Sequence, residues 1–141
     1  MKMRRYSEAK LPDIENYTEM IYHRSIMKTI AIQGSLKDVT FLVGTCAQDN
    51  FDIIDISEPD DIWFHVRDGS SCHVIAKIPA GEKLDKKTIH KIIKQGALLC
   101  KQESRYKSTK NLAIIYTKLR NVQKTGIVGS VIADYISTIF I

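Results

Sequence analysis

Two histidines flank a short polar turn in the middle of the chain. His65 and His73 stand eight positions apart, and the residues between them include the Asp-Gly-Ser-Ser segment 68–71. Imidazole, hydroxyl and carboxylate groups serve acid–base chemistry, nucleophilic catalysis, metal binding and hydrogen bonding to phosphate. This segment therefore raises three hypotheses: a catalytic site, a metal site and a recognition surface.

The catalytic and metal hypotheses each lack a residue or motif that such a site normally has. The histidines could hold a metal with Asp61 or Asp68, but a catalytic zinc normally has three protein ligands, and this spacing matches no zinc signature. Ser71 or Cys72 could be a nucleophile beside a histidine base, yet no GxSxG elbow surrounds them. We predict no catalytic residue, no metal and no cofactor, and we keep a metal- or His-dependent nuclease or hydrolase as an alternative.

Two other interpretations of the histidine pair stay open. In the structural interpretation, Trp63 packs in the core with its strand neighbours, and the histidines satisfy buried hydrogen bonds near the turn. In the recognition interpretation, imidazoles, serine hydroxyls and turn amides contact phosphate, or the imidazoles stack on exposed bases. We expect Trp63 and Tyr116 in the core under either interpretation, because both lie in apolar strand patterns.

A β-hairpin must position the histidines. Residues 62–66 and 73–78 are rich in β-branched and aromatic side chains, and the polar turn joins them. If these runs pair antiparallel, His65 comes nearly opposite His73, so the two rings become neighbours. The pattern therefore predicts that a single hairpin brings both imidazoles together.

The rest of the chain alternates between strand and helix periodicities. A helix over 85–102 would have an apolar stripe and lysines outside that stripe. The fold class predicted is α+β or mixed α/β, with a central, mostly antiparallel or mixed sheet, one long amphipathic helix packed on it and a short second helix. The other predicted elements are strands over 26–32 and 39–43 around a Gly34-Ser35 turn, a short helix over 48–56, a strand over 112–117 and one more strand over 135–141.

The amino-terminal residues differ in character from the rest. Residues 1–25 are polar and mixed, and they are predicted to be an extension that carries a short helix over 13–23. No repeat or Pro/Gly/Ser linker divides the remainder, so residues 26–141 are predicted to form one domain.

Composition excludes several classes of protein. The 141 residues are 44% hydrophobic and 26% charged, which is typical of a globular domain. No apolar run approaches the ~20 residues that span a bilayer, and the first residues do not resemble a signal peptide. We therefore expect a cytoplasmic protein without a membrane partner. Cys46, Cys72 and Cys100 lack CxxC spacing and are expected to be reduced, small buried side chains.

Charge is segregated along the chain. Residues 38–68 contain eight acids and a single base, a net charge of −7. Residues 77–124 contain thirteen Lys and Arg and three acids, a net charge of +10. Clustered cations of this kind favour a polyanion partner, because they release counterions from a phosphate backbone. A solvated basic surface is the alternative, and the acidic segment could instead serve a protein-interaction adaptor.

The hairpin also carries a family resemblance. DIWFHV followed by SSCHVI resembles the signature of the NFACT-R module, an RNA-binding domain of ribosome-associated quality-control factors and of smaller stand-alone proteins. Further motifs follow the family's order: LVG with Asn50, a Lys-rich helix, NLAIIYT, NVQKTG and the Gly-Ser-Val at 129–131. The resemblance covers residues 26–141 and is strongest to the stand-alone type. Cys72 and Phe51 depart from the usual residues at their positions.

The resemblance implies a non-catalytic module that binds structured RNA, such as transfer or ribosomal RNA, with the ribosome as a further partner. It suggests a link to translation or ribosome-associated quality control but not tail synthesis, for which the large factors use segments that this sequence does not contain. Basic side chains would hold phosphates, while His and Tyr side chains would stack or contact riboses. The predicted RNA-binding residues are His65, Arg67, Ser70, Ser71, His73, Arg105, Tyr106, Lys107, Lys110, Lys118, Arg120 and Lys124.

Overall fold

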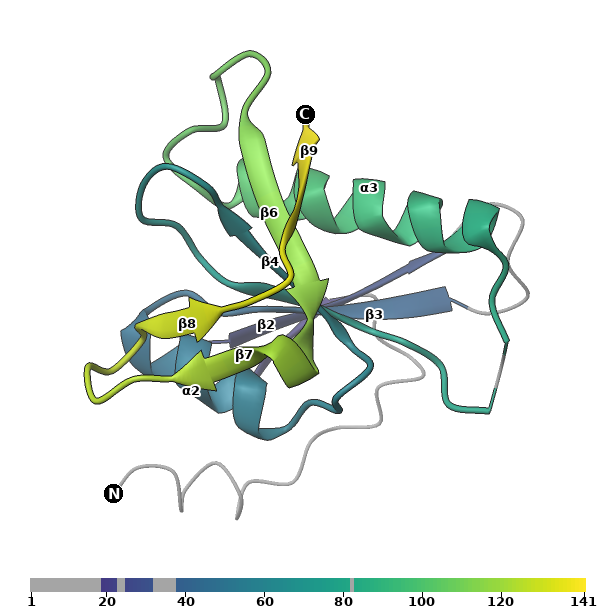
Figure 1. Cartoon of the computed structure of the whole chain (residues 1–141), viewed down its shortest axis with the longest axis horizontal. Helices are drawn as coiled ribbons and strands as arrows, with labels where there is room; N and C mark the ends of the chain where they lie inside the picture. The colour runs from purple at the N-terminus through teal and green to yellow at the C-terminus, as the bar shows by residue number, and fades with distance from the viewer. Residues whose placement is uncertain (1–18, 23–24, 32–37, 82) are drawn as a thin grey trace.

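Antiparallel strand pairing organises the chain. The computed structural model describes residues 19–22, 25–31, 38–81 and 83–141. A seven-stranded sheet has the order β1-β2-β3-β5-β4-β6-β9 (Figure 1), and each neighbouring pair is antiparallel. Its strands are β1 (Glu19–Tyr22), β2 (Ser25–Ala31), β3 (Asp38–Val43), β4 (Ile62–Val66), β5 (Val74–Lys77), β6 (Ala113–Lys118) and β9 (Ser137–Phe140).

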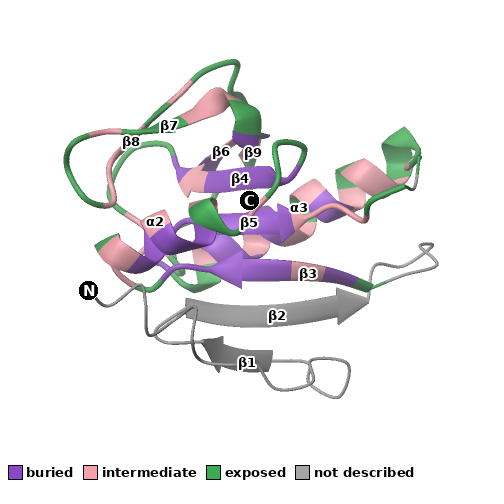
Figure 2. Cartoon of the chain, turned by 90° about the horizontal axis from the view of Figure 1, so that it is seen from below, coloured by how far each residue is buried: buried purple, intermediate pink, exposed green. Residues whose placement is uncertain are grey.

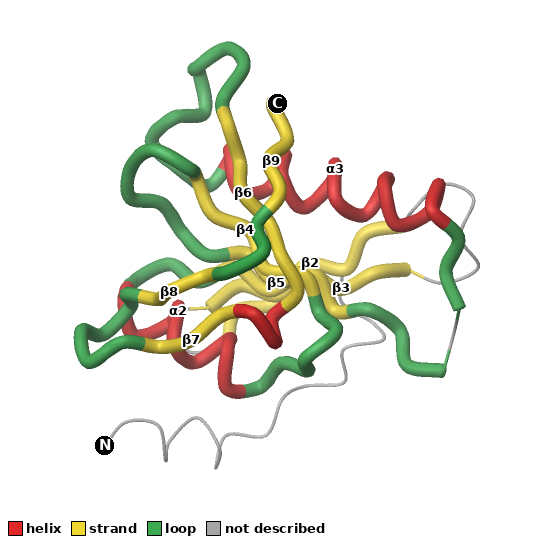
Figure 3. The backbone as a smooth tube through the Cα atoms, viewed as in Figure 1, coloured by secondary structure: helices red, strands yellow, loops and turns green. Residues whose placement is uncertain are grey.

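The remaining elements are two α-helices, a short 3-10 helix and a small ribbon (Figure 3). They are α2 (Ala47–Asp55), α3 (Lys86–Gln102), η2 (Leu119–Asn121) and the antiparallel strands β7 (Val122–Lys124) and β8 (Val131–Ala133). The predicted fold class, with one long helix on a sheet and a short second helix, is therefore confirmed. Among the described residues, no helix is both long and apolar enough to cross a bilayer.

Helix α3 covers one face of the sheet because its apolar stripe matches that face. Asp85 caps its first turn by accepting a hydrogen bond from the Thr88 amide at 2.8 Å. The stripe includes Ile92, Gly96 and Cys100, which are all buried. Gly96 allows close packing, since a Cβ there would lie 2.3 Å from the Phe64 ring. The helix therefore fixes β4, the strand that carries His65.

The opposite face of the sheet is covered by α2 and the β7–β8 ribbon. Its core consists of the buried residues Leu42, Ile53, Trp63, Ile75 and Leu119. Side chains alternate along β4, so Trp63 enters this second core while its neighbours face α3. Figure 2 shows buried residues along β3, β4 and β5, between the two helices. The histidines lie on the same face as Trp63, at the end of the sheet.

Several predicted elements are confirmed, and one is corrected. The helix predicted over 13–23 is wrong at its end, where Glu19–Tyr22 forms β1. Pairing with β2 supplies the backbone hydrogen bonds there and overrides a local helical pattern. The strand predicted at the end of the chain is confirmed as β9, and Val131–Ala133 forms a further strand, β8, in a different sheet. The Gly34-Ser35 turn lies outside the described residues, and the domain boundary at residue 25 stays a prediction.

Candidate functional site

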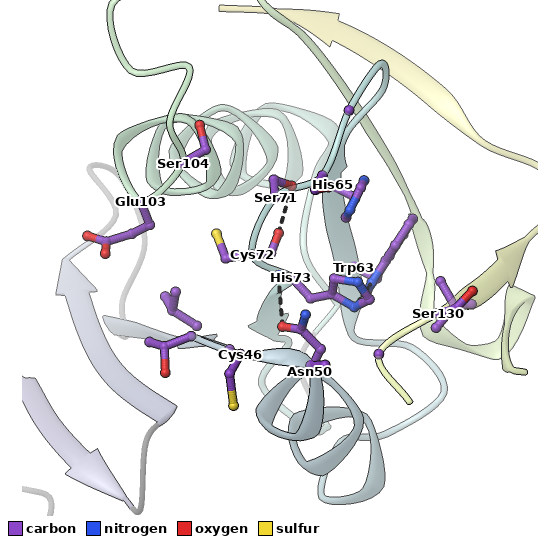
Figure 4. Close-up of a pocket in the computed structure, with 18 of the residues that line it drawn as sticks. Cys46, Asn50, Trp63, His65, Ser71, Cys72, His73, Glu103, Ser104 and Ser130 are labelled. Atoms are coloured by element: carbon purple, nitrogen blue, oxygen red, sulfur yellow. Dashed lines mark hydrogen bonds between the residues drawn. The ribbon is translucent and has the colours of Figure 1, made fainter. Parts of the chain in front are cut away.

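The histidine pair forms as its spacing predicts. In the β4–β5 register Phe64 pairs with Val74, so the next positions outward bring His65 opposite His73. Their ring centroids are 5.1 Å apart with nearly perpendicular planes. Trp63 lies parallel to His65 at 5.7 Å and edge-on to His73 at 5.5 Å (Figure 4). Three aromatic side chains from one hairpin therefore form a single cluster.

Hydrogen bonds fix the orientation of this cluster. The buried Trp63 indole donates from Nε1 to His73 Nδ1 at 3.1 Å. The His73 amide donates to Asn50 Oδ1 at 3.1 Å, which ties the cluster to α2. His65 Nδ1 lies 2.6 Å from the Val66 carbonyl, which can only accept, so this nitrogen carries the proton. Because His73 Nδ1 accepts the hydrogen bond from the Trp63 indole, His73 is neutral and its proton is on Nε2.

Burial keeps both imidazoles uncharged. His73 is 3% exposed, and burial together with the nearby His65 lowers its pKa to about 3. Burial also lowers the pKa of the half-buried His65, against the opposing effect of the Val66 carbonyl. At neutral pH the pair therefore offers hydrogen-bonding and stacking groups but no positive charge. The structural interpretation describes His73 well, and Trp63 is in the core as predicted.

An open pocket of about 1200 Å³ lies over this cluster. Trp63, His65 and His73 form part of its lining, together with Asn50 and Ile115. Such a volume is large enough for a nucleotide-sized group. Its walls come from four separate segments: the β3–α2 loop at 44–47, the hairpin turn at 69–73, the end of α3 at 103–105, and residues 128–131 of the ribbon.

Two glycines let these walls approach closely. A Cβ at Gly44 would lie 2.2 Å from Asn50 Oδ1, the atom that holds the His73 amide. Gly129 has φ 86°, and a Cβ there would lie 2.7 Å from Ala47. Bulkier residues at either position would displace a wall of the pocket. Gly129 lies within the Gly-Ser-Val motif at 129–131, for which composition suggests no role.

The hairpin turn combines a residue that holds its shape with several exposed residues. Ser71 Oγ accepts a hydrogen bond from the Val66 amide at 3.1 Å and donates one to the Cys72 carbonyl at 2.9 Å. Ser70 is exposed and lines the pocket. Arg67 is also exposed, pairs with Asp68 at 3.0 Å and lies 5.8 Å from the centroid of the Phe140 ring. Ser71 therefore holds the turn in shape, while Ser70 and Arg67 are exposed.

Of the predicted basic residues after α3, only Arg105 is among the residues that line the pocket. Arg105 stacks over the half-buried Tyr106 at 5.5 Å from the ring centroid. Lys107 and Lys110 are exposed on the loop that follows. Within the described part of the chain, none of the three cations makes an ion pair. We call Arg67, Arg105, Lys107 and Lys110 the rim group.

The other predicted cations lie elsewhere and are paired with acids. Arg120 forms an ion pair with Asp60, and Lys118 Nζ lies 3.8 Å from the same carboxylate. Lys124 pairs with Asp55 and lies 4.9 Å from the Phe51 ring centroid. Lys118, Arg120 and Lys124, the ribbon group, do not line the pocket. The structure therefore separates the predicted basic surface into two groups.

Asp61, a possible metal or catalytic partner in the alternative hypothesis, is a structural residue. It is 1% exposed, and its carboxylate accepts hydrogen bonds from Lys77 Nζ at 2.6 Å, the Ile78 amide at 2.9 Å and the Glu58 amide at 2.8 Å. These bonds fix the start of β4 to the end of β5. Among the residues that the structure describes, no group of three His, Cys, Asp or Glu side chains could hold a metal ion.

Sequence reasoning missed several pocket residues. Asn50, Ser104 and Ser130 all line the cavity, yet none was among the predicted site residues. Asn50 and the segment 129–131 belong to motifs of the family resemblance, which was the only available signal for them. Ser104 carries no signal of charge or spacing, because it reaches the pocket only when the end of α3 packs beside the hairpin.

Comparison with known proteins places the chain in a family. It is 35% identical over 92 residues to coiled-coil domain-containing protein 25 of Danio rerio, covering 62% of this chain and 42% of the relative. It is 30% identical over 87 residues to the Mus musculus protein of that name, with the same coverage. The chain thus spans less than half the length of these relatives.

A solved structure shows the same fold. The C-terminal part of the fibronectin/fibrinogen-binding protein from Streptococcus suis matches with a TM-score of 0.64 and 17% identity, covering 80% of this chain and 43% of that one. Residues 19–134 match the family described as NFACT protein RNA binding domain. That match includes the hairpin, α2, α3 and the ribbon, which together form the pocket. The chain belongs to the NFACT protein RNA binding domain family.

Proposed function

We propose that this chain binds structured RNA, such as transfer or ribosomal RNA, at the pocket and its rim group, and that it catalyses no reaction. The observation that carries the proposal is the pocket itself. A member of an RNA-binding family has a neutral aromatic floor beside cations that make no ion pair among the described residues, apart from Arg67 with Asp68. Stacking surfaces beside cations suit unpaired bases and phosphates.

Each part of the site would meet a different part of the RNA. Arg105, Lys107 and Lys110 would contact phosphates, with Arg67 at the other side of the turn. Ser70 and the half-buried His65 would contact a base or ribose inside the pocket. Cations outside and neutral groups inside favour an RNA whose backbone bends over the rim while one unstacked nucleotide enters the pocket.

Three features support binding without catalysis. His73, whose pKa is about 3, is a weak base and is not in the imidazolium form that could act as an acid at neutral pH. The hydroxyl of Ser71 is engaged with the backbone of its own hairpin. Asp61 is enclosed by Lys77 and two backbone amides. A nuclease or hydrolase would need at least one of these groups to be available.

The cellular setting is part of the same proposal. The family resemblance suggests a role in translation or ribosome-associated quality control, with the ribosome as a further partner, and we propose that the chain acts in the cytoplasm. Because the chain spans 42% of the Danio rerio relative, tasks of a longer protein are not assigned to this domain. An adaptor that uses the acidic segment is the second class, and its binding would survive neutralisation of the rim group.

The decisive experiment is an RNA titration at several salt concentrations. Fluorescence polarisation with a labelled transfer RNA should give a steep salt dependence. For about five phosphate contacts at roughly 0.7 each, the slope of log K against log salt should be about −3.5. Lys83→Gln is a matched control, since this exposed lysine lies outside the pocket. Intact binding with a slope near zero would contradict the proposal, as would cleavage of the RNA that is lost in His65→Ala.

A further inference from the structure

Two cysteines face each other at the edge of the pocket. Cys72 Sγ lies 3.8 Å from the Cys100 carbonyl oxygen, and Cys100 Sγ lies 3.8 Å from the Cys72 carbonyl oxygen. This reciprocal approach brings each thiol against the backbone of the other residue. Ser71 Oγ lies 4.0 Å from Cys100 Sγ, at the edge of the same contact. Two cysteines that are 28 positions apart in the chain are therefore in direct contact.

The two thiols differ in accessibility. Cys72 is half-buried and lines the pocket, so a small solute that enters the pocket can reach it (Figure 4). Cys100 is fully buried on the inner stripe of α3. Cys46 also lines the pocket and is half-buried, but its contacts do not include a second cysteine. Only the Cys72–Cys100 pair combines an accessible thiol with a neighbouring one.

The difference in protonation matches this geometry. The hydrogen bond from the Cys100 thiol lowers the pKa of Cys72, against the effect of burial. The same neighbour, together with burial, raises the pKa of Cys100 well above its usual range. The thiolate is the reactive form of cysteine, so the accessible member of the pair is also the more nucleophilic one.

We propose that Cys72 is an oxidation site that reacts with a peroxide and then forms a disulfide with Cys100, and that this bond weakens RNA binding at the pocket. The first part stands on the geometry of the pair. The second part rests on the proposed RNA-binding function. The site was not predicted from the sequence, which lacks CxxC spacing.

The reaction balances with hydrogen peroxide as the oxidant. The Cys72 thiolate attacks one peroxide oxygen, an S–O bond forms, the O–O bond breaks, and the departing hydroxide takes up a proton to leave as water. The Cys100 sulfur then attacks the sulfenic sulfur of Cys72. An S–S bond forms, and the displaced hydroxide takes the Cys100 proton to leave as a second water. The two thiols lose two electrons, and the peroxide gains them.

The disulfide would join two walls of the pocket. Cys72 ends the turn that carries Ser70 and Ser71. Cys100 lies just before 103–105, the end of α3 that forms another wall and carries Arg105. A covalent bond between Cys72 and Cys100 fixes the distance between the hairpin turn and the end of α3. RNA that requires a different separation of these walls would then bind more weakly.

Peptide mapping tests the chemistry. After treatment of the full chain with hydrogen peroxide, trypsin without reductant should release the peptides 68–77 and 95–101 linked together, about 2 Da lighter than their sum because two hydrogens are lost. Cys72→Ser should abolish the linked species, whereas Cys46→Ser should leave it unchanged. Peroxide that instead modifies Cys46 first, or that leaves peptides 68–77 and 95–101 unlinked, would overturn the oxidation site.

A binding titration tests the consequence. The oxidised chain should bind labelled transfer RNA roughly tenfold more weakly than the reduced chain. This loss corresponds to about one base-stacking contact. Dithiothreitol should restore binding, and Cys72→Ser should bind equally before and after peroxide. Equal affinity of the linked and reduced chains would overturn the regulatory part. If the reduced chain binds no RNA while the linked peptides still form, the proposed function fails and the oxidation site stands.

Discussion

The rim group and the ribbon group contain the same kinds of side chain in different electrostatic settings. Arg105, Lys107 and Lys110 of the rim make no ion pair with any described residue. In the ribbon group, by contrast, each cation lies against a carboxylate of Asp55 or Asp60. Cations with the same formal charge should therefore differ in their attraction for phosphate.

The acidic segment explains this difference. Residues 38–68 and 77–124 are oppositely charged in sequence, and the fold brings part of the first beside part of the second. Arg120, which donates a hydrogen bond to the Asp60 carboxylate, lowers the pKa of Asp60. An anion that approaches the ribbon group must compete with these carboxylates. A cluster of cations predicts a polyanion surface only where the fold leaves the cations unpaired.

The largest expected effect is a loss of folding stability at acidic pH, caused by the buried, uncharged His73 on the floor of the pocket. His73 has a pKa of about 3 in the folded chain and an ordinary value of 6.5, so the unfolded chain binds a proton that the folded chain resists. The free energy of unfolding should therefore fall as the pH falls from 6.5 towards 3. Between about pH 7.5 and about pH 5 the loss should be about 2 kcal/mol through His73.

Urea unfolding at both pH values measures this loss. His73→Gln removes the titrating group and retains an acceptor for the Trp63 indole, so its stability should depend less on pH. His90→Gln, at an exposed position on α3, is the control and should keep the dependence of the parent chain. The same pH dependence in His73→Gln and the parent would mean that the pocket interior is not kept neutral by His73.

The next effect tests the rim group itself. Replacing Arg105, Lys107 and Lys110 together with Gln should weaken transfer RNA binding more than tenfold at ~0.15 M salt and flatten the salt slope by about two units, at roughly 0.7 per contact. Thermal unfolding should change little, since these are surface positions. A variant that melts normally and binds as tightly as the parent would remove the rim from the site.

A smaller effect is expected for the ribbon group. The triple Gln variant of Lys118, Arg120 and Lys124 should weaken binding only about threefold and change the salt slope by less than about one unit, because each cation is already paired. The two triple variants are matched in number and chemistry, so one titration series compares them. Equal losses in both would show that local pairing does not decide which cations meet RNA.

The smallest effect sharpens the same comparison. Asp60→Asn removes the shared partner of Lys118 and Arg120 and should tighten RNA binding by up to about twofold, steepening the salt slope slightly. Asp68→Asn is a matched control next to the rim, where it frees Arg67 alone. Polarisation titrations at low and moderate salt measure both. Weaker binding by Asp60→Asn would indicate that this carboxylate orders a needed contact rather than competing with phosphate.

Much of the fold was predictable because local patterns and tertiary packing agree. The hairpin of β4 and β5 follows from its strand-rich runs, and its register brings His65 opposite His73 as expected. Helix α3 follows from its apolar stripe and the Asp85 cap. The family was likewise indicated by ordered motifs, and its match confirms that resemblance.

The failures occur where contacts outside a segment decide its structure. Glu19–Tyr22 has a helical pattern but forms β1, because β2 offers a backbone partner. The ribbon strands β7 and β8 are three residues each, too short to produce a clear pattern. Their packing against the core cluster that contains Trp63, far away in the chain, fixes them in place. Local propensity is a weak guide where such contacts decide.

The sequence by itself determined which groups are available: a histidine pair on one hairpin, a cationic helix, and opposite charges in two segments. Only the tertiary structure decided which of them share a site. It paired Lys118, Arg120 and Lys124 with acids, turned His73 into a buried neutral group, and brought Cys72 beside Cys100. Charge and proton affinity depend on what lies within a few ångströms, and chain folding sets those distances between residues far apart in sequence.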